Sequence, residues 1–253
     1  MRTPDFGFRV VAETPEWIVV DKPPFLLVHP KKPDGPKTLW DGLRDLLAFE
    51  LANGGQISIV NRLDRETSGL VLVCKTAAAA RRFHEAMKRR EVEKEYLALV
   101  WGWPEHEAFT VDAPLLRQGE QLPTAIYLKR CVHPQGAEAV TRFRVEARFE
   151  KETSAGNRFA LLRAFPQTGR THQIRVHLAH AGHPIVGDKI YGPDERCYLE
   201  FIETGWTPSL EQRLLLPRHA LHSTRLRVAA QTGEMLEWNA PLAPDLAQWM
   251  ESH

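Results

Sequence analysis

The sequence predicts an α+β protein with a mixed, largely antiparallel central sheet and flanking helices. Three observations lead to this class: short β-rich segments follow one another in runs, few helical segments separate them, and Gly- or Pro-containing turns lie between them. A doubly wound parallel sheet would instead need strands that alternate with helices. The 253 residues are enough for one large core or two closely joined halves.

The N-terminal part of the chain combines β-rich segments with helical ones. Strands are expected at 8–12, 17–20, 56–60, 69–74 and 96–101. Thr38 is placed to cap a helix that runs to about Ala52, and Gly54-Gly55 follows as its stop signal. Thr76 is placed to cap a second helix, from Ala77 to about Arg90, which carries several basic side chains.

A loop around 103–123 is the best candidate for a boundary between two half-domains of about 1–105 and 106–253. After it, 140–149 alternates with a period of two, which predicts a strand with one buried and one basic face. The buried face is expected to hold Thr141, Phe143, Val145, Ala147 and Phe149, and the basic face Arg142, Arg144, Glu146 and Arg148. The remaining predictions are a strand at 159–165, a short helix capped by Thr171 and ended by Gly182, and a hairpin of 225–229 and 235–238.

The composition excludes several classes of protein. No apolar run approaches the roughly 18 residues of a membrane span, and no secretory signal opens the chain, so we expect a cytoplasmic protein with no membrane partner. The three cysteines are widely spaced and match neither a disulfide framework nor a zinc site. The net charge is only +1, but 141–183 contains eight Arg or Lys against three Glu. Such a local excess suits phosphate and is equally typical of a solvated face.

A polar segment between two β-rich runs, 61–68, carries the first candidate for chemistry. Asp64 lies in this segment between Arg62 and Arg65. Nearby cations keep a carboxylate ionised at neutral pH, and an ionised carboxylate can act as a nucleophile or a base. The alternative is a surface turn in which aspartate and arginine merely pair, because exposed ion pairs are common.

Two further candidates are the segment 169–178 and Tyr96. The segment combines a turn with the start of a helix that carries Arg170 and His172, which suits phosphate; a surface basic helix is the alternative. Arg175 lies at the edge of the apolar face of this helix and would need a carboxylate partner where it is buried. Tyr96 opens an apolar strand, either as a core aromatic or as a ring that stacks on a base.

Several histidines lie close together at and after the start of this helix. Metal ligation by His172, His177, His180 and His183 is one interpretation of them. The stretch has no HExxH pattern and no carboxylate or cysteine until Asp188, so it lacks the usual ligand spacing. We therefore expect no metal, and histidines that are solvated or face RNA.

The candidate segments together resemble the RluA-type family of RNA pseudouridine synthases. The matching stretches are VDKPPFLLVHP at 20–30, NRLDRETSGLVL at 61–72, KEYLALV at 94–100, GRTHQIRVHL at 169–178, HPIVGDKIYG at 183–192 and RHALHSTRL at 218–226. The order of these motifs and their plausible spacing make the signal specific. The resemblance implies the pseudouridine synthase fold, with two half-domains around a catalytic cleft.

The resemblance also implies an activity: isomerisation of specific uridines to pseudouridine in structured rRNA, tRNA or both, with the target base flipped out. The reaction is redox-neutral and needs no energy source, so no cofactor is implied. Asp64 falls on the catalytic aspartate of the family, and Arg175 on the arginine that pairs with it. Tyr96 falls on the tyrosine that packs against the target base. Arg62 falls on an arginine that holds the flipped nucleotide, and Leu178 is assigned with it to substrate binding.

The sequence departs from the family pattern in two ways. Asn61 stands where the family usually has His. The chain also begins almost directly with catalytic-domain sequence, which leaves no room for the S4 RNA-binding domain of many relatives. We therefore expect RNA recognition by the catalytic domain itself. We also expect the protein to be a monomer. The expected contacts are the helix at 77–90, Arg148, Arg65, Arg142, Arg144, Arg170 and His172.

Two other functions compete with this interpretation. A non-catalytic RNA-binding protein that kept the fold would be expected to have lost Asp64, Tyr96 or Arg175, and all three are present. A metal-dependent hydrolase would use the histidine cluster, where the ligand spacing of such enzymes is absent.

Overall fold

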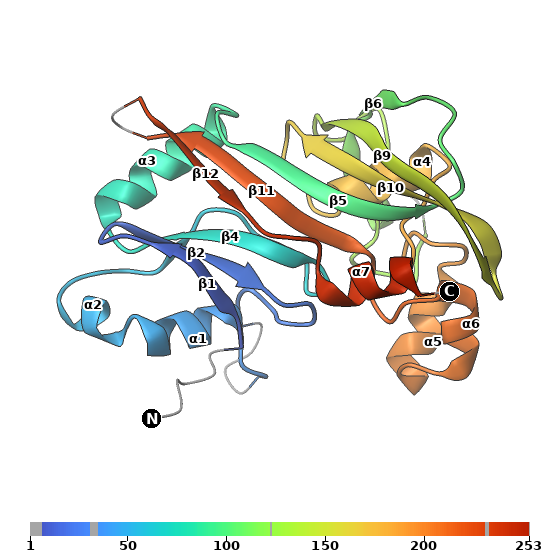
Figure 1. The fold of residues 1–253 in the computed structure, drawn as a ribbon, viewed down its shortest axis with the longest axis horizontal. Helices are drawn as coiled ribbons and strands as arrows, with labels where there is room; N and C mark the ends of the chain where they lie inside the picture. Colours follow the sequence, from blue (N-terminus) through green and yellow to red (C-terminus); the bar gives the residue numbers. More distant parts are fainter. Residues whose placement is uncertain (1–6, 31–34, 122, 231–232, 253) are drawn as a thin grey trace. The chain divides into compact units, whose positions relative to one another are not determined.

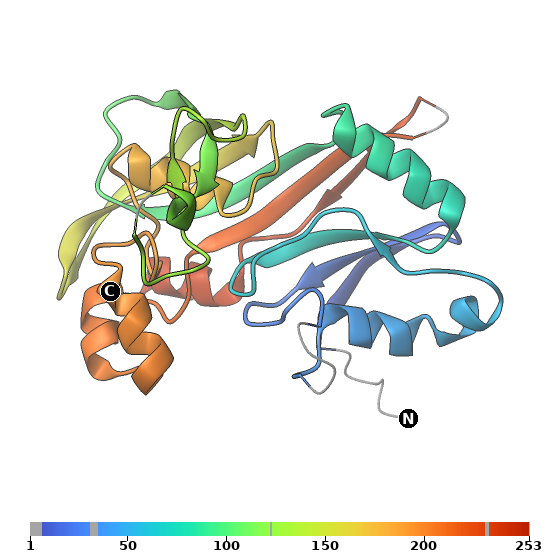
Figure 2. The same ribbon diagram turned by 180° about the vertical axis from the view of Figure 1, so that it is seen from behind.

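The computed structural model describes residues 7–30, 35–121, 123–230 and 233–252. The chain divides into two compact units: unit 1 contains Met1–Lys94 and His222–Ala243, and unit 2 contains Glu95–Leu221 and Pro244–His253. Figures 1 and 2 show the elements of both units from opposite sides. The fold class is α+β, with mixed, largely antiparallel strand pairing and flanking helices, as predicted.

Unit 1 is built on strands in the order β1-β2-β4-β11-β12, and β3 also pairs with β4. The strands are β1 (Arg9–Glu13), β2 (Trp17–Lys22), β3 (Ser58–Ile59), β4 (Ser68–Cys74), β11 (Leu221–Ala229) and β12 (Met235–Asn239). β4 and β11 run parallel, and the other pairs are antiparallel. β4 has partners on both of its edges and is buried along its whole length. Burial on both faces of the sheet explains its nearly unbroken apolar sequence.

The helices of unit 1 are α1 (Leu39–Leu46), α2 (Ala48–Ala52) and α3 (Ala77–Lys88). Both predicted N-caps are confirmed: Thr38 forms a capping box with Asp41, and the Thr76 hydroxyl accepts a hydrogen bond from the backbone N–H of Ala79. The single helix predicted up to residue 52 is wrong, because Leu47 leaves helical geometry and separates α1 from α2. α3 buries Phe83 and its neighbouring alanines in a core that includes Trp17 and Trp238.

Unit 2 is built on four antiparallel strands in the order β5-β10-β9-β6. These are β5 (Glu93–Trp101, in this unit from Glu95), β6 (Ala108–Asp112), β9 (Val140–Thr153) and β10 (Gly156–Pro166). A separate hairpin pairs β7 (Leu115–Arg117) with β8 (Arg130–Val132), and a 3-10 turn, η1, spans Gln118–Glu120. The helices are α4 (Gln173–His180), α5 (Arg196–Thr204), α6 (Pro208–Leu214) and α7 (Pro244–Glu251).

Two helices lie against opposite faces of the unit 2 sheet. Gln173 and His177 of α4 bind the hydroxyl of Thr141, which shares a face of β9 with Phe143. Trp249 of α7 packs edge-on against Phe149 and Phe159 on the other face. The face under α4 is also the one that carries Tyr96, because Tyr96 pairs with Ala164 and Ala164 with Phe143.

A β-bulge in β9 overturns part of the predicted alternation. Val145 pairs with Leu162 and Ala147 with Leu161, so Glu146 is an extra residue with no partner in β10. Beyond Glu146 the two faces of β9 exchange places. Ala147 and Phe149 therefore share the face of Arg144, and Arg148 lies on the opposite face. The predicted basic row is interrupted at this point, and Ala147 is exposed instead of buried.

The division into units also differs from the half-domains expected at 1–105 and 106–253. The chain passes from unit 1 to unit 2 at Lys94, inside β5, and 222–243 returns to unit 1. The return follows from strand pairing, since β11 adds to the edge of β4 and β12 adds to β11. The terminal hairpin is confirmed as a strand pair, while Gln231 and Thr232 of its predicted turn lie outside the described residues. Within the described ranges, no helix combines the length and the hydropathy that crossing a membrane requires.

Candidate active site

Asp64 lies in the loop that connects β3 with β4, as expected from its position between two β-rich runs. The residue is half-buried, whereas Arg62 and Arg65 on either side are exposed. The backbone N–H of Thr67 donates to the carbonyl of Asp64 over 3.2 Å, which closes a turn around it. The loop thus combines a partly shielded carboxylate with two flanking cations, which suits chemistry on an anionic polymer.

Two contacts hold the middle of this loop against the segment that follows β2. Lys22 is fully buried, and its ammonium group donates to the carbonyls of Pro23, Leu26 and Arg65 over 2.9, 3.0 and 3.2 Å. In the opposite direction, Arg65 Nε donates to the carbonyl of Phe25 over 3.3 Å. A buried ammonium group needs such acceptors, so this arrangement fixes the backbone next to Asp64.

At its C-terminal end the loop enters β4, where β4 packs tightly against the parallel strand β11. Ser68 Oγ lies 2.9 Å from Nδ1 of His222, the residue that it pairs with in β11. Gly69 follows with a φ of +108°, and a Cβ built on it would lie 2.2 Å from the carbonyl oxygen of Ser223. Only glycine satisfies both conditions, which explains the Ser-Gly pair that ends the loop.

In unit 2, α4 starts differently from the prediction. Thr171 is exposed and does not cap the helix; the N-cap is His172, with a left-handed φ of 59° and no side-chain capping bond. The Gln173 amide organises this turn, because its oxygen accepts from the backbone N–H of Arg170 and from Thr168 Oγ1, and its nitrogen donates to Thr141 Oγ1. The Gln173 side chain therefore stabilises the turn before α4, a role that the prediction gave to a Thr171 cap.

Arg175 is 5% exposed and forms a bidentate ion pair with Asp188. The distances are 2.6 Å from Nε to Oδ2 and 2.9 Å from the terminal nitrogen to Oδ1. Burial alone would raise the pKa of Asp188, but the charge and hydrogen bonds of Arg175 hold that pKa well below its usual range. The backbone N–H groups of Ile190 and Tyr191 also donate to Oδ1. The carboxylate that a buried Arg175 was expected to need is therefore present.

The predicted substrate-binding side chains of unit 2 lie in α4 or on the sheet face that α4 covers. Leu178 is fully buried, and Tyr96 is 8% exposed on the sheet face that α4 covers. At the start of the helix, His172 Nδ1 lies 2.8 Å from the hydroxyl of Tyr191. The Tyr191 ring in turn lies 5.0 Å from the Arg175 guanidinium. Residues 173–178 are all buried, which corrects the picture of a helix with a single inward face.

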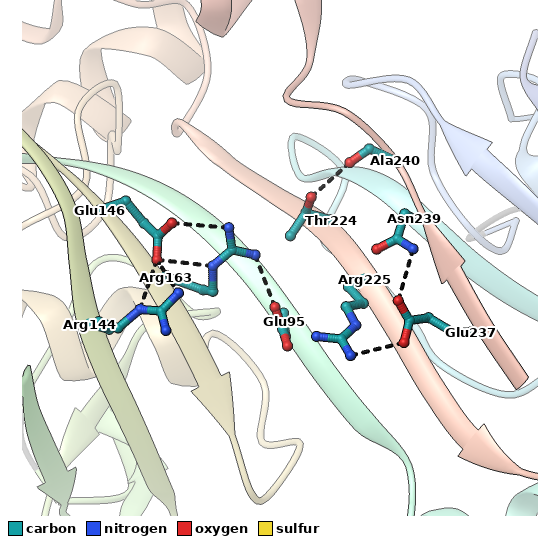
Figure 3. Close-up of polar contacts among 9 residues, drawn as sticks. All are labelled: Glu95, Arg144, Glu146, Arg163, Thr224, Arg225, Glu237, Asn239 and Ala240. Atoms are coloured by element: carbon teal, nitrogen blue, oxygen red, sulfur yellow. Dashed lines mark hydrogen bonds and ion pairs between the residues drawn. The ribbon is translucent and has the colours of Figure 1, made fainter. Parts of the chain in front are cut away.

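Arg142 and Arg144 occupy the sheet face opposite to α4. The Arg142 guanidinium lies over the ring of Phe165, 4.6 Å from its centroid. Arg144 donates two hydrogen bonds to Glu146, which also binds Arg163 (Figure 3). These contacts, those from Arg163 foremost, lower the pKa of Glu146. Arg144 is thus largely neutralised, so the predicted basic face is less basic than the count of arginines suggested.

Two further predicted RNA contacts, Arg170 and Arg148, also have hydrogen-bond partners close by, and so does Arg225 of unit 1. Arg170 is exposed, and its Nε donates to the carbonyl of Glu138 over 3.0 Å. Arg148 binds Glu107 and the carbonyl of Pro104. In unit 1, Figure 3 shows Arg225 of β11 donating to Glu237 of β12 over 2.9 Å. Local pairing of cations is therefore a general feature of these sheet surfaces.

The histidines do not form a metal cluster in the described ranges, where no group of three His, Cys, Asp or Glu side chains converges. His177 is fully buried, with Nδ1 2.9 Å from Thr141 Oγ1 and Nε2 3.0 Å from the carbonyl of Ala113. A carbonyl only accepts, so Nε2 carries the proton, and burial lowers the pKa of the ring. The expectation that these histidines are solvated or face RNA is wrong for His177, which has a structural role.

The sequence analysis missed three polar residues that hold the candidate segments in place: Lys22 in unit 1, and Gln173 and Asp188 in unit 2. Asp188 was within reach, because it is the acidic residue of the matched stretch HPIVGDKIYG. Lys22 binds backbone carbonyls, and the Gln173 amide binds backbone groups and the hydroxyls of Thr141 and Thr168. Such contacts leave no periodic signal in a sequence.

Comparison with known proteins agrees with this architecture. Residues 16–180 match the profile of the RNA pseudouridylate synthase family. The chain is 37% identical over 256 residues to the ribosomal large subunit pseudouridine synthase D of Escherichia coli K12, covering 98% of this chain and 71% of that protein. It is 34% identical over 250 residues to the protein of the same name from Haemophilus influenzae, covering 96% and 70%.

Two solved structures have the same fold over nearly the whole chain. Human RNA pseudouridylate synthase domain containing 1 aligns with a TM-score of 0.69 and 26% identity, covering 97% of this chain and 89% of that chain. Human RNA pseudouridylate synthase domain containing 4 aligns with a TM-score of 0.70 and 24% identity, covering 94% and 90%, and supports the fold alone.

The fold and the match across most of the chain define an isomerase that acts on RNA. The chain belongs to the RNA pseudouridylate synthase family, in its RluA-type branch. It converts uridine to pseudouridine in RNA, and the motif resemblance drawn from the sequence is thereby confirmed.

Proposed function

We propose that Asp64 is the catalytic carboxylate and that a uridine of large-subunit ribosomal RNA is the substrate. The observation that carries the first part is the setting of Asp64: a half-buried carboxylate in a loop whose backbone is bound by the buried Lys22. Such a carboxylate is held in one geometry while Arg62 and Arg65 favour its ionised form. The proposed substrate is taken from the name of two curated relatives, ribosomal large subunit pseudouridine synthase D of Escherichia coli K12 and of Haemophilus influenzae.

Family resemblance supplies the roles of the other site residues. Tyr96 would pack against the uracil, Leu178 would line the substrate site, and Arg175 would hold the catalytic carboxylate ionised. Arg62 would keep the target nucleotide outside its stack. Base flipping is part of this proposal, because a glycosidic bond inside a stacked helix is out of reach of a side chain.

RNA binding is proposed to combine phosphate contacts from several segments. Arg65, Arg142 and Arg170 are exposed and fit this role, whereas Arg144 already binds Glu146. His172, half-buried at the start of α4, would add a polar contact. The exposed end of α3 contributes Lys88. The curated relatives are bacterial proteins named for the large ribosomal subunit. Because bacterial ribosomes assemble in the cytoplasm, we propose a cytoplasmic location for this protein.

The test is single-site pseudouridine mapping with Asp64→Asn, which keeps the shape of the side chain and removes its charge. Wild type, Asp64→Asn and the exposed control Asp45→Asn are incubated with unmodified transcripts of large-subunit ribosomal RNA and, separately, of transfer RNAs. We expect wild type and Asp45→Asn to modify one or a few ribosomal sites and Asp64→Asn to modify none. Full activity of Asp64→Asn would disprove the catalytic role, and modification of transfer RNA alone would disprove the substrate.

A further inference from the structure

Asn61 closes the base of the Asp64 loop with its side-chain amide. The residue is 5% exposed. Its Nδ2 donates to the carbonyl of Leu70 over 3.0 Å, and its Oδ1 accepts from the backbone N–H of Leu72 over 2.8 Å. Both ends of the buried amide are therefore bound to β4, the strand that follows the loop.

The two backbone groups bound by Asn61 are those that a continued strand β3 would bind. β3 pairs with β4 at Ile59 and Val73, and the next backbone N–H, of Val60, donates to the carbonyl of Leu72 over 2.9 Å. In a regular antiparallel ladder, Leu72 N–H would next bind the carbonyl of residue 60, and the carbonyl of Leu70 would bind the N–H of residue 62. The Asn61 amide takes both positions.

Because the Asn61 amide replaces the backbone partners, the chain can leave the sheet after Val60 while the backbone groups of Leu70 and Leu72 stay hydrogen-bonded. One edge of β4 is occupied by β2 along its length, from Gly69 to Cys74. The other edge is shared between β11 at Ser68 and Gly69 and β3 near the far end. The Asn61 amide fills the interval between these two partners. Unsatisfied groups in that interval would be costly, because β4 is buried throughout.

We propose that Asn61 is a positioning residue for Asp64, an inference that rests on the catalytic role proposed for Asp64. Asp64 is three residues away from this anchor along a loop with no strand pairing of its own. A change at the anchor is therefore transmitted to the carboxylate. Displacing a reacting group by about 1 Å can lower a rate about 100-fold.

The chemistry of position 61 allows a graded test. Asn offers one donor side and one acceptor side; Asp offers only acceptors, and Leu offers neither. His, the usual residue of the family at this position, offers both when neutral but only donors when protonated. Asn61→His should thus serve as a rescue variant at high pH and fail at low pH, which a mere packing role would not produce.

The experiment measures single-turnover pseudouridine formation on a large-subunit ribosomal RNA transcript that wild type modifies, together with the RNA dissociation constant and thermal unfolding. We expect Asn61→Asp and Asn61→Leu to lower the single-turnover rate about 10- to 100-fold at a temperature where both are folded. The rates are compared at saturating RNA, because Arg62 and Arg65 share the loop and are themselves proposed to contact RNA, so a displaced loop also changes the RNA dissociation constant. The exposed Asn157→Asp of β10 is the matched control and should behave as wild type.

Asn61→His adds the pH readout. Its rate relative to wild type should approach one well above the ordinary histidine pKa of about 6.5 and fall below it. Wild-type rates of Asn61→Asp and Asn61→Leu, or losses that only track the unfolded fraction or the dissociation constant, would overturn the positioning role. If Asp64→Asn instead matches wild type on the same transcript, the proposed catalytic role fails, and the role of Asn61 fails with it.

Discussion

Arg175 and Asp188 form a bidentate ion pair in which both side chains are at most 5% exposed. The pair ties α4 to the segment that follows it, and Asp188 also accepts from the backbone N–H groups of Ile190 and Tyr191. With both carboxylate oxygens bound, Asp188 holds the arginine in a fixed orientation. The proposed role of Arg175 toward the substrate site therefore depends on a residue that lies outside its helix.

Replacement of Asp188 by Asn should destabilise the protein strongly. The variant keeps the shape of the side chain but leaves Arg175 buried without its carboxylate, and breaking a buried pair in this way costs about 3–5 kcal/mol in the free energy of unfolding. Urea denaturation at neutral pH measures the loss, with Asp45→Asn as an exposed control. Because the pKa of Asp188 is lower in the folded state, its contribution is complete above the unfolded pKa of about 3.9. The gap between wild type and variant should shrink as the pH falls below that value; equal stability at neutral pH would contradict the prediction.

His177 should make the protein less stable in mild acid. Burial lowers the pKa of His177 in the folded state below the unfolded value of about 6.5, so the unfolded state binds more protons as the pH falls. The stabilising contribution of the neutral ring is complete above that value and is lost below it. Chemical denaturation between about pH 7.5 and pH 5 should show this loss in wild type and a shallower loss in His177→Gln. Parallel curves for the two proteins would show that another group is responsible.

Arg142 and Arg144 should differ in their contribution to RNA binding, although both are exposed on one sheet face. Arg144 donates to Glu146, whereas the Arg142 guanidinium lies over an aromatic ring. Arg142→Ala should lower the slope of log affinity against log salt by about one, as expected for one lost phosphate contact. Arg144→Ala should change the slope less. Filter binding across a salt series tests this, and equal slopes for both variants would show that the ion pair does not screen Arg144.

Gly69→Ala should be far more damaging than Gly54→Ala, although both glycines have positive φ. The added methyl group would lie 2.2 Å from the Ser223 carbonyl oxygen at position 69, whereas nothing lies within 4 Å at position 54. Backbone strain and overpacking together should cost Gly69→Ala about 2–5 kcal/mol of folding free energy. Strain alone should cost Gly54→Ala about 1 kcal/mol. Thermal unfolding compares the two, and similar losses would mean that β4 and β11 can separate to admit the methyl group.

The elements that the sequence predicted well are those with a local signal. The caps at Thr38 and Thr76 were predicted because a hydroxyl before an amphipathic run acts within three residues. The cap at Thr171 was wrong because the Gln173 amide, bound to distant strand residues, organises that turn instead. The alternation of β9 was predicted correctly up to Val145 and failed at the bulge, because a bulge is defined by the partner strand.

The sequence by itself determined the fold class, the family and the loop that carries Asp64, because periodicity, capping chemistry and motif order are all readable along one chain. Only the tertiary structure decided which groups meet: that 222–243 returns to the N-terminal unit, that Asp188 binds Arg175 and that Asn61 completes the edge of β4. The physical reason is the same in each case. A strand edge or a buried charge needs a partner, and the sequence shows the need but not which distant residue supplies it.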